Sequence, residues 1–167
     1  KFMGTLWNNY AFYVLYANID NFKPSDHALD YDMLGVMDKW VLSRLHSLIA
    51  AVEKNLDDYR ITESARAIQE FTDDLSNWYV RRSRERFWQK EMSQDKINAY
   101  MTLECVLMEM TKLIAPFVPF LAEEIYQNLS AGMGDGSPES VHLCDFPQAN
   151  PDYTDEELEK NMKLVLD

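Results

Sequence analysis

Apolar residues recur every three or four positions along most of this 167-residue sequence. That spacing places them on one face of an α-helix, because successive residues turn by about 100° around the helix axis. The pattern predicts five helices, over residues 2–16, 38–56, 62–88, 95–115 and 119–129. The most regular is the second, whose repeating apolar residues are Val41, Leu45, Leu48, Val52 and Leu56. The expected fold is therefore all-α, a bundle of about five helices.

Residues with capping side chains stand at the predicted helix starts. Asp38, Thr62 and Asp95 each offer an oxygen that can accept a hydrogen bond from amides of the first turn. Pro119 suits the first turn of the fifth helix, where the amide has no helical partner, and Pro116 ends the fourth. That fourth helix is apolar around much of its circumference, so we expect it in the centre of the bundle.

The C-terminal part of the sequence is less regular. Residues 130–140 are a Gly-rich stretch typical of a flexible loop, and residues 141–146 predict a short extended segment that ends before a proline. Residues 155–167 predict a charged helix that is cut short. We therefore expect a helical bundle domain over residues 1–147, followed by a linker and the start of a truncated helix over residues 148–167.

Composition narrows the class of protein. The apolar content of 47% supports a core, and the formal net charge of -12 argues against a nucleic-acid binder that uses its whole surface. Cys105 and Cys144 are too few for a disulfide framework and too far apart for a paired-cysteine metal motif. No leader and no run of about 18 apolar residues occurs. We expect a monomer in the reducing cytoplasm, without membrane contact, cut from a longer protein because Lys1 already opens a helical pattern.

One short stretch is rich in positive charge, in contrast to the net negative charge of the whole chain. Residues 77–88 contain four arginines and four large aromatic residues, namely Arg81, Arg82, Arg84, Arg86, Trp78, Tyr79, Phe87 and Trp88. Arginine combines a planar fork of donors with a face that stacks, so this mixture suits phosphates and unpaired bases. Nucleic acid is therefore the first partner to consider.

A purely structural interpretation of the same stretch is also open. In a helix, Arg81 and Glu85 lie four positions apart and could pair, while the aromatic residues could belong to the core. Basic runs are often only solvated helix faces. Acidic residues precede the arginines along this helix, an order that the helix macrodipole favours by about 0.3 to 1 kcal/mol per charge at best. Arginines that are covered and paired would favour this structural interpretation.

The sequence offers little for catalysis. Glu139 and His142 have the Glu-x-x-His spacing of di-metal bundles, but they fall in a predicted loop, and a second such pair is missing. No nucleophile elbow, Gly-rich phosphate loop or His-Glu-x-x-His motif occurs. We therefore expect no catalytic residue, metal or cofactor in this chain. A free-standing helical metalloenzyme would instead require a bound transition metal and inward-facing carboxylates.

Five segments carry a resemblance to a known family. They are Thr-Leu-Trp-Asn at 5–8, Tyr-Ala-Asn-Ile-Asp at 16–20, Asp-Lys-Trp-Val-Leu-Ser-Arg-Leu at 38–45, the arginine-rich stretch at 77–88, and Leu-Ile-Ala-Pro-Phe-Val-Pro-Phe-Leu-Ala-Glu-Glu-Ile-Tyr at 113–126. Together they resemble the anticodon-binding helical domain of isoleucyl-tRNA synthetases, which are class I aminoacyl-tRNA synthetases. The last segment is shared with the related valine, leucine and methionine enzymes, so the arginine-rich stretch favours isoleucine.

The resemblance implies a parent enzyme that activates isoleucine with ATP and magnesium and then transfers it to tRNA. The family's signatures His-Ile-Gly-His and Lys-Met-Ser-Lys-Ser are absent here, so we expect this chain alone to be inactive. Its implied partners are an isoleucine-accepting tRNA, held by the anticodon arm, and the remainder of the synthetase chain. The residues implied in RNA contact are Arg81, Arg82, Arg84, Arg86, Trp78, Trp88 and, more weakly, Lys90.

The alternative within the same family is a structural role. A helical spacer between the catalytic core and a C-terminal region would need little direct RNA contact. The two hypotheses differ in whether the arginines of residues 77–88 are exposed or are covered by acidic partners.

Overall fold

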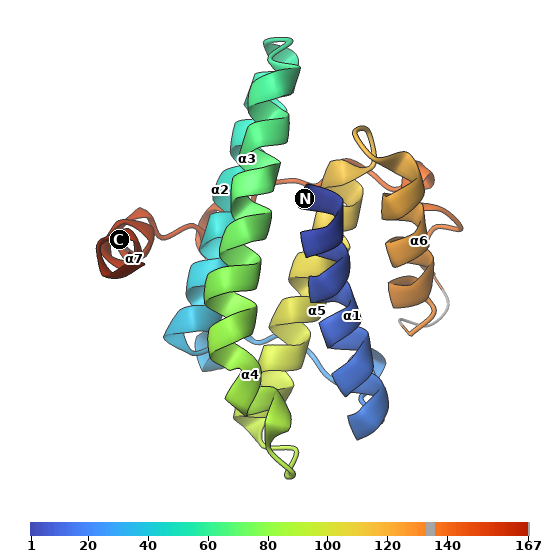
Figure 1. Cartoon of the computed structure of the whole chain (residues 1–167), viewed down its shortest axis with the longest axis vertical. Helices are drawn as coiled ribbons and strands as arrows, with labels where there is room; N and C mark the ends of the chain where they lie inside the picture. Colours follow the sequence, from blue (N-terminus) through green and yellow to red (C-terminus); the bar gives the residue numbers. More distant parts are fainter. Residues whose placement is uncertain (133–135, 167) are drawn as a thin grey trace.

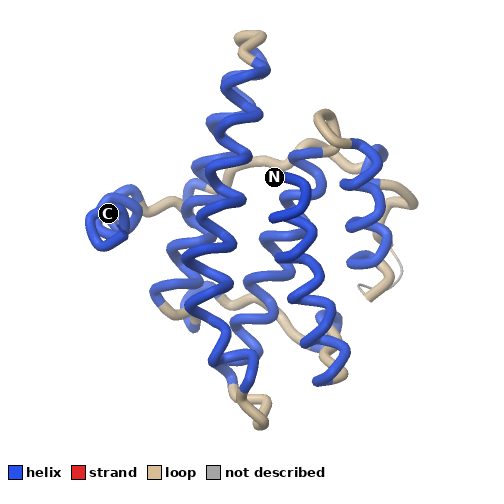
Figure 2. Tube along the Cα trace, viewed as in Figure 1, coloured by secondary structure: helices blue, strands red, loops and turns tan. Residues whose placement is uncertain are grey.

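Helices form nearly all of the regular structure in this computed structural model, which describes residues 1–132 and 136–166. They are α1 (Phe2–Asp20), α2 (Val36–Asp57), α3 (Ile61–Asp74), α4 (Arg81–Trp88), α5 (Gln94–Ile114), α6 (Pro119–Ser130) and α7 (Glu156–Leu166). A π-helical segment, Leu75–Val80, joins α3 to α4 without a break. The described residues contain no strand (Figure 2). The predicted all-α fold is confirmed.

The helices are arranged around α5. Helices α2 and α3 form a long hairpin whose tip projects beyond the rest of the bundle (Figure 1). Helix α5 contacts α1, α2, α4 and α6, which confirms the prediction that this strongly apolar helix lies in the centre. In the described part of the chain, no helix combines the length and the apolar character that crossing a membrane requires.

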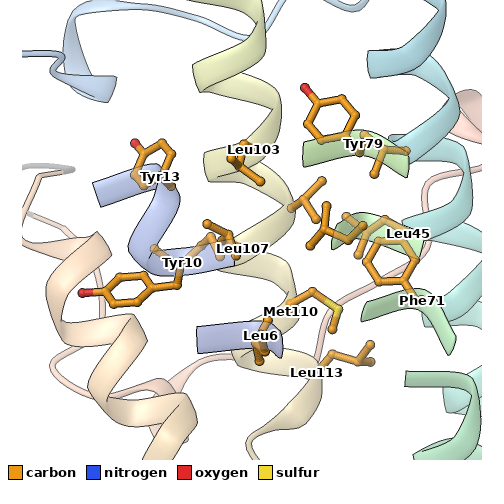
Figure 3. Close-up of a cluster of buried hydrophobic side chains, with 14 of the residues drawn as sticks. Leu6, Tyr10, Tyr13, Leu45, Phe71, Tyr79, Leu103, Leu107, Met110 and Leu113 are labelled. Carbon is orange, nitrogen blue, oxygen red and sulfur yellow. The ribbon is translucent and has the colours of Figure 1, made fainter. Parts of the chain in front are cut away.

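The core fills the space on both sides of α5. Figure 3 shows Leu6, Tyr10 and Tyr13 of α1 beside Leu103 and Leu107 of α5. On the other side of α5, the side chains come from α2, α3 and the π-helical segment; those labelled in the figure are Leu45, Phe71 and Tyr79. Each is nearly fully buried. Burial of one large apolar side chain stabilises a fold by about 1.5–3 kcal/mol, so this layer dominates the stability of the bundle.

The predicted N-caps at Asp38, Thr62 and Asp95 are wrong. Each lies inside the first turn of its helix. The observed N-cap residues of α2, α3 and α5 are Gly35, Arg60 and Ser93. The two aspartates have another task, because the carboxylates of Asp38 and Asp95 bind the guanidinium of Arg86. In the sequence these two aspartates have the position and the side chain of ordinary N-caps, although in the structure they form tertiary ion pairs.

Helix α1 extends one turn beyond its predicted end near Tyr16. Its last residue is Asp20, and Asn21 ends it with a left-handed backbone at φ 51°. The Asp20 carboxylate lies 2.6 Å from Nζ of Lys96 and accepts a hydrogen bond from the Tyr100 hydroxyl. These contacts with α5 hold the last turn of α1 in place, although the local sequence predicts a loop there.

The predicted extended segment over residues 141–146 is wrong at its start. Val141–Leu143 forms a single 3₁₀ turn. The carboxylate of Glu123 on α6 accepts a hydrogen bond from the Val141 amide at 2.9 Å, so the turn is held by one specific acceptor rather than by a neighbouring strand. The Gly-rich loop predicted just before it includes residues 133–135, which lie outside the described residues.

The predicted charged helix near the C-terminus is α7, and it packs against α2. Its Glu159 carboxylate accepts hydrogen bonds from the hydroxyls of Ser43 and Ser47, the latter at 2.8 Å. The same carboxylate lies 3.6 Å from Nη1 of Arg44. The boundary proposed after residue 147 stays a prediction, while these contacts show how the C-terminal segment is attached to the bundle.

His46 of α2 fixes the segment that leads to α7. The ring is buried, and its Nδ1 accepts a hydrogen bond from the Asn150 amide at 3.1 Å. The Tyr153 ring lies 5.2 Å away. Burial lowers the pKa of His46, although the nearby Glu109 carboxylate opposes the shift. The neutral ring is therefore the form that holds this segment.

Replacement of His46 by Gln is expected to reduce the loss of stability at low pH. In the unfolded chain the ring takes up a proton near its ordinary pKa of about 6.5, whereas the folded chain resists protonation. The stability that His46 contributes is thus fully present above about pH 6.5 and is lost as the pH falls through its lowered folded-state pKa. Urea denaturation at pH 7.5 and 5.5 measures this difference in both proteins.

The comparison of the two proteins isolates His46 from other titrating groups. Burial raises the pKa of Glu104 to about 7, and that group responds with the opposite sign because its protonated form is favoured in the fold. An equal change in unfolding free energy between the two pH values in both proteins would contradict the role given to His46.

Candidate nucleic-acid interface

The arginine-rich stretch lies where the α3–α4 rod changes its winding. The segment Leu75–Val80 is π-helical, and such turns hold more residues than α-helical turns, so they rotate the residues that follow relative to the first part of the rod. In this segment Tyr79 is fully buried and Trp78 is half-buried. Arg81 and Arg82, which come next, are exposed. The π-helical segment thus separates the core-facing aromatic residue from the exposed arginines.

Three of the four arginines form an exposed group, which we call the arginine patch: Arg81, Arg82 and Arg84. Within the described residues, no carboxylate lies within 4.0 Å of their guanidiniums. Glu85, the partner that helical spacing offers to Arg81, is itself exposed. The structural interpretation required these arginines to be covered and paired, so their exposure favours a surface that binds an external anion.

Trp78 stands at the edge of the arginine patch. The guanidinium of Arg82 lies over its ring, 5.1 Å from the centroid. Trp78 also lines a pocket of about 480 Å³. The residues that line this pocket are Trp40, Arg44, Glu70, Asp74, Trp78, Glu159, Lys160 and Lys163. An aromatic wall with charges of both signs can accept a planar polar group, and Trp78, which lines the pocket and contacts Arg82, adjoins both the pocket and the patch.

The sequence analysis missed most of the residues that line this pocket. Trp40 and Arg44 lie four positions apart on α2 and therefore share one face of that helix. This spacing could have indicated a shared site, but the same spacing occurs in any amphipathic helix. Lys160 and Lys163 come from α7. No pattern within the sequence shows that α7 packs beside α2.

Trp88 and Lys90 lie at the far end of α4. Trp88 is 57% exposed, and its ring Nε1 donates a hydrogen bond to the Tyr16 hydroxyl at 2.7 Å. This bond holds an exposed aromatic surface in one orientation, so less conformational entropy is lost when another ring stacks on it. Lys90 is exposed just beyond the helix.

Arg86 is placed differently from the other three arginines. Its Nη1 and Nη2 lie 2.7 and 2.8 Å from the two carboxylate oxygens of Asp38, and its Nε lies 2.9 Å from Asp95. The Tyr79 hydroxyl also donates to Asp38 at 2.7 Å. Asp38 is completely buried. The structure thus gives the Arg86 guanidinium a structural partner, and a contact between Arg86 and RNA stays a prediction.

The charge state of this buried network follows from its geometry. Burial by itself would lower the pKa of Arg86, but the hydrogen bonds and the negative charge of Asp38 outweigh it and raise the pKa. Burial raises the pKa of Tyr79 well above its ordinary value, and the charge of Asp38 raises it further. The network therefore contains a guanidinium cation, a carboxylate that accepts three hydrogen bonds from Arg86 and Tyr79, and a neutral phenol.

In residues 1–132 and 136–166, no group of three or more His, Cys, Asp or Glu side chains is placed to hold a metal ion. What the arrangement supplies is guanidinium cations, exposed aromatic rings and a pocket that adjoins them.

Comparison with known proteins identifies relatives of this chain. The family described as the anticodon-binding domain of tRNA ligase matches residues 38–167. The isoleucine-tRNA ligase of Clostridium kluyveri is 54% identical over 163 residues, which are 98% of this chain and 16% of that protein. Isoleucine-tRNA ligase of Dehalococcoides mccartyi is 48% identical over 99% of this chain, and isoleucine-tRNA ligase 2 of Bacillus cereus is 50% identical over 99%. The chain spans 15–16% of the length of these three relatives.

Replacement of Asp38 by Ala is expected to destabilise the fold by about 3–5 kcal/mol, because it leaves the cation of Arg86 and the hydroxyl of Tyr79 without their buried partner. Replacement of Asp95, whose carboxylate also binds Arg86 but is 57% exposed, should cost under about 1 kcal/mol. Urea denaturation measures both values. A loss below about 1 kcal/mol for Asp38→Ala would show that the buried network is not needed.

Proposed function

This chain belongs to the family of anticodon-binding domains of tRNA ligases, and from that premise we propose that it holds the anticodon arm of an isoleucine-accepting tRNA. The observation that carries the proposal is the arginine patch, which is exposed and has no acidic partner among the described residues. The recognition surface in this proposal comprises Arg81, Arg82, Arg84, Trp78, Trp88 and Lys90.

The patch suits a folded RNA better than a simple anion. Guanidinium groups bind phosphate oxygens through parallel hydrogen bonds, and each contact releases counterions from the RNA backbone. The whole chain has a net charge of -12 even with the patch included, so its overall field repels RNA and the patch is a local exception. The local gathering of exposed cations therefore favours an approach of the tRNA backbone along α4.

Unpaired bases of the anticodon loop can stack on the aromatic residues beside the patch. Trp88 offers a ring that its hydrogen bond to Tyr16 already orients. Trp78 is partly covered by Arg82. A base that stacks on Trp78 replaces that guanidinium, which is then available for a phosphate. The RNA thus exchanges an internal cation-π contact for two contacts of its own.

The chain acts in this proposal as one part of a longer isoleucine-tRNA ligase. ATP and magnesium serve the catalytic region of that enzyme, and this chain, which lacks the family's ATP-binding signatures, supplies no catalytic group. One cytoplasmic monomer binds one tRNA. If the chain were only a helical spacer, replacement of any residue of the arginine patch would leave the affinity for tRNA unchanged.

Replacement of Arg82 or Arg84 by Ala is expected to weaken tRNA binding and to flatten its dependence on salt. Each lost phosphate contact reduces the slope of log affinity against log salt concentration by about 0.7–0.9. Fluorescence titration of the chain with isoleucine tRNA between 50 and about 200 mM salt measures both quantities. Arg66→Ala is the matched control, because Arg66 is another exposed arginine on the same rod and should leave the slope unchanged. Equal slopes in all four proteins would exclude phosphate contacts by the two residues.

Replacement of Trp88 by Ala is expected to weaken tRNA binding by about 1–3 kcal/mol, the usual contribution of one stacked base. Trp7→Ala serves as the control, since Trp7 is 40% exposed and lies on α1, outside the proposed surface. Affinity for isoleucine tRNA should fall for the first variant and stay unchanged for the second. If both variants bind as tightly as the parent chain, Trp88 is not a stacking surface.

A further inference from the structure

A row of exposed apolar side chains runs along the outer side of α1. Its members, which we call the α1 stripe, are Met3, Trp7, Ala11, Leu15 and Ile19. They follow at intervals of four, so they lie along one side of the helix. All five are exposed, and the four large ones are between 40% and 63% accessible. Single exposed apolar residues are ordinary, whereas a contiguous row marks an interaction surface.

The outer side of α1 also lacks the charges that a helix surface in water normally carries. Residues 2–19 contain no charged residue, in a chain in which 26% of residues are charged. The one charged residue of α1, Asp20, is bound to Lys96 and Tyr100 of α5. The opposite side of the helix is already used, because Leu6 packs with its neighbours into the core (Figure 3). A helix that is apolar on both sides is expected to be buried on both sides.

We propose that the α1 stripe packs against another part of the same ligase polypeptide, outside this chain. The chain spans 16% of the length of its Clostridium kluyveri relative, so most of such a polypeptide is available to cover the stripe. A tethered segment acts at an effective concentration of about 1 mM, far above that of a separate partner. This inference depends on the chain being part of a longer ligase and is independent of RNA contact.

Other occupants fit the α1 stripe less well. RNA requires cations for its phosphates, and residues 2–19 contain none. An anionic membrane surface repels a chain of net charge -12. A second copy of the chain carries a matching apolar row, but it has to associate at its own low concentration rather than at that of a tethered segment. The surface that covers the stripe is therefore apolar, uncharged and covalently linked.

Thiol labelling of the full-length ligase tests the proposal. Ala11→Cys places a thiol in the middle of the α1 stripe, and Ala65→Cys places one on α3, at an equally small residue that is also exposed inside a helix. Each variant is reacted with a maleimide without tRNA, and the rate at that site is measured by peptide mass spectrometry against the rate in denatured protein. We expect the thiol at position 11 to react at least tenfold more slowly than the thiol at position 65.

Three results would overturn the proposal, and each identifies a different situation. Equal rates at the two positions would show that the stripe is open to solvent in the whole enzyme. Protection at position 11 that disappears on dilution would assign the stripe to a second copy. Protection that appears only after tRNA is added would make the stripe part of the RNA surface. Because the main comparison contains no RNA, it holds or fails separately from tRNA binding by the arginine patch.

Discussion

The ion pair between Asp38 and Arg86 is the constraint on which the rest of the recognition surface depends. It joins a completely buried carboxylate near the start of α2 to a guanidinium on α4, and Asp95 extends it to the start of α5. A buried charge without its partner costs several kcal/mol, so these three helices have one favourable relative arrangement. The same arrangement fixes how α4 presents its other arginines to solvent.

The arginines of α2 and α4 divide into two groups with different tasks. Arg44 and Arg86 each bind more than one carboxylate, and they hold helices together. The arginine patch has no such partner among the described residues. In a protein of high negative charge, carboxylates are plentiful, so a cluster of exposed arginines without one is the feature that most needs an external partner. A phosphate backbone supplies it with the geometry that guanidinium groups bind best.

Helical periodicity was enough to predict the fold but not the ends of its elements. Leu45, Leu48 and Val52 are buried as predicted. The periodic pattern predicts burial well because removing apolar side chains from water is the main energy that stabilises the fold. The N-caps failed because aspartates near a helix start can serve either the local backbone or a distant guanidinium. Asp38 serves mainly the latter, since Arg86 lies 48 positions further along the chain. No local pattern carries that information.

The residues of the candidate site could be predicted from the sequence, but which of their side chains are exposed to solvent could not. The sequence placed four arginines and several aromatic residues on one helix, and it left open which of them were covered. The π-helical segment decides this, because it directs Tyr79 into the core and leaves Arg81 and Arg82 in solvent. The pocket beside Trp78 could not be predicted, since α7 closes it with Lys160 and Lys163 from the other end of the chain.

The most direct test of the central claim compares two parts of the same RNA. The anticodon stem-loop and the acceptor-stem minihelix of isoleucine tRNA are titrated separately against this chain at one moderate salt concentration, with intact tRNA as the reference. If the arginine patch holds the anticodon arm, the stem-loop retains most of the affinity of the intact tRNA and the minihelix binds at least tenfold more weakly. Equal affinity for the two RNAs, or no binding of the stem-loop, would contradict the account.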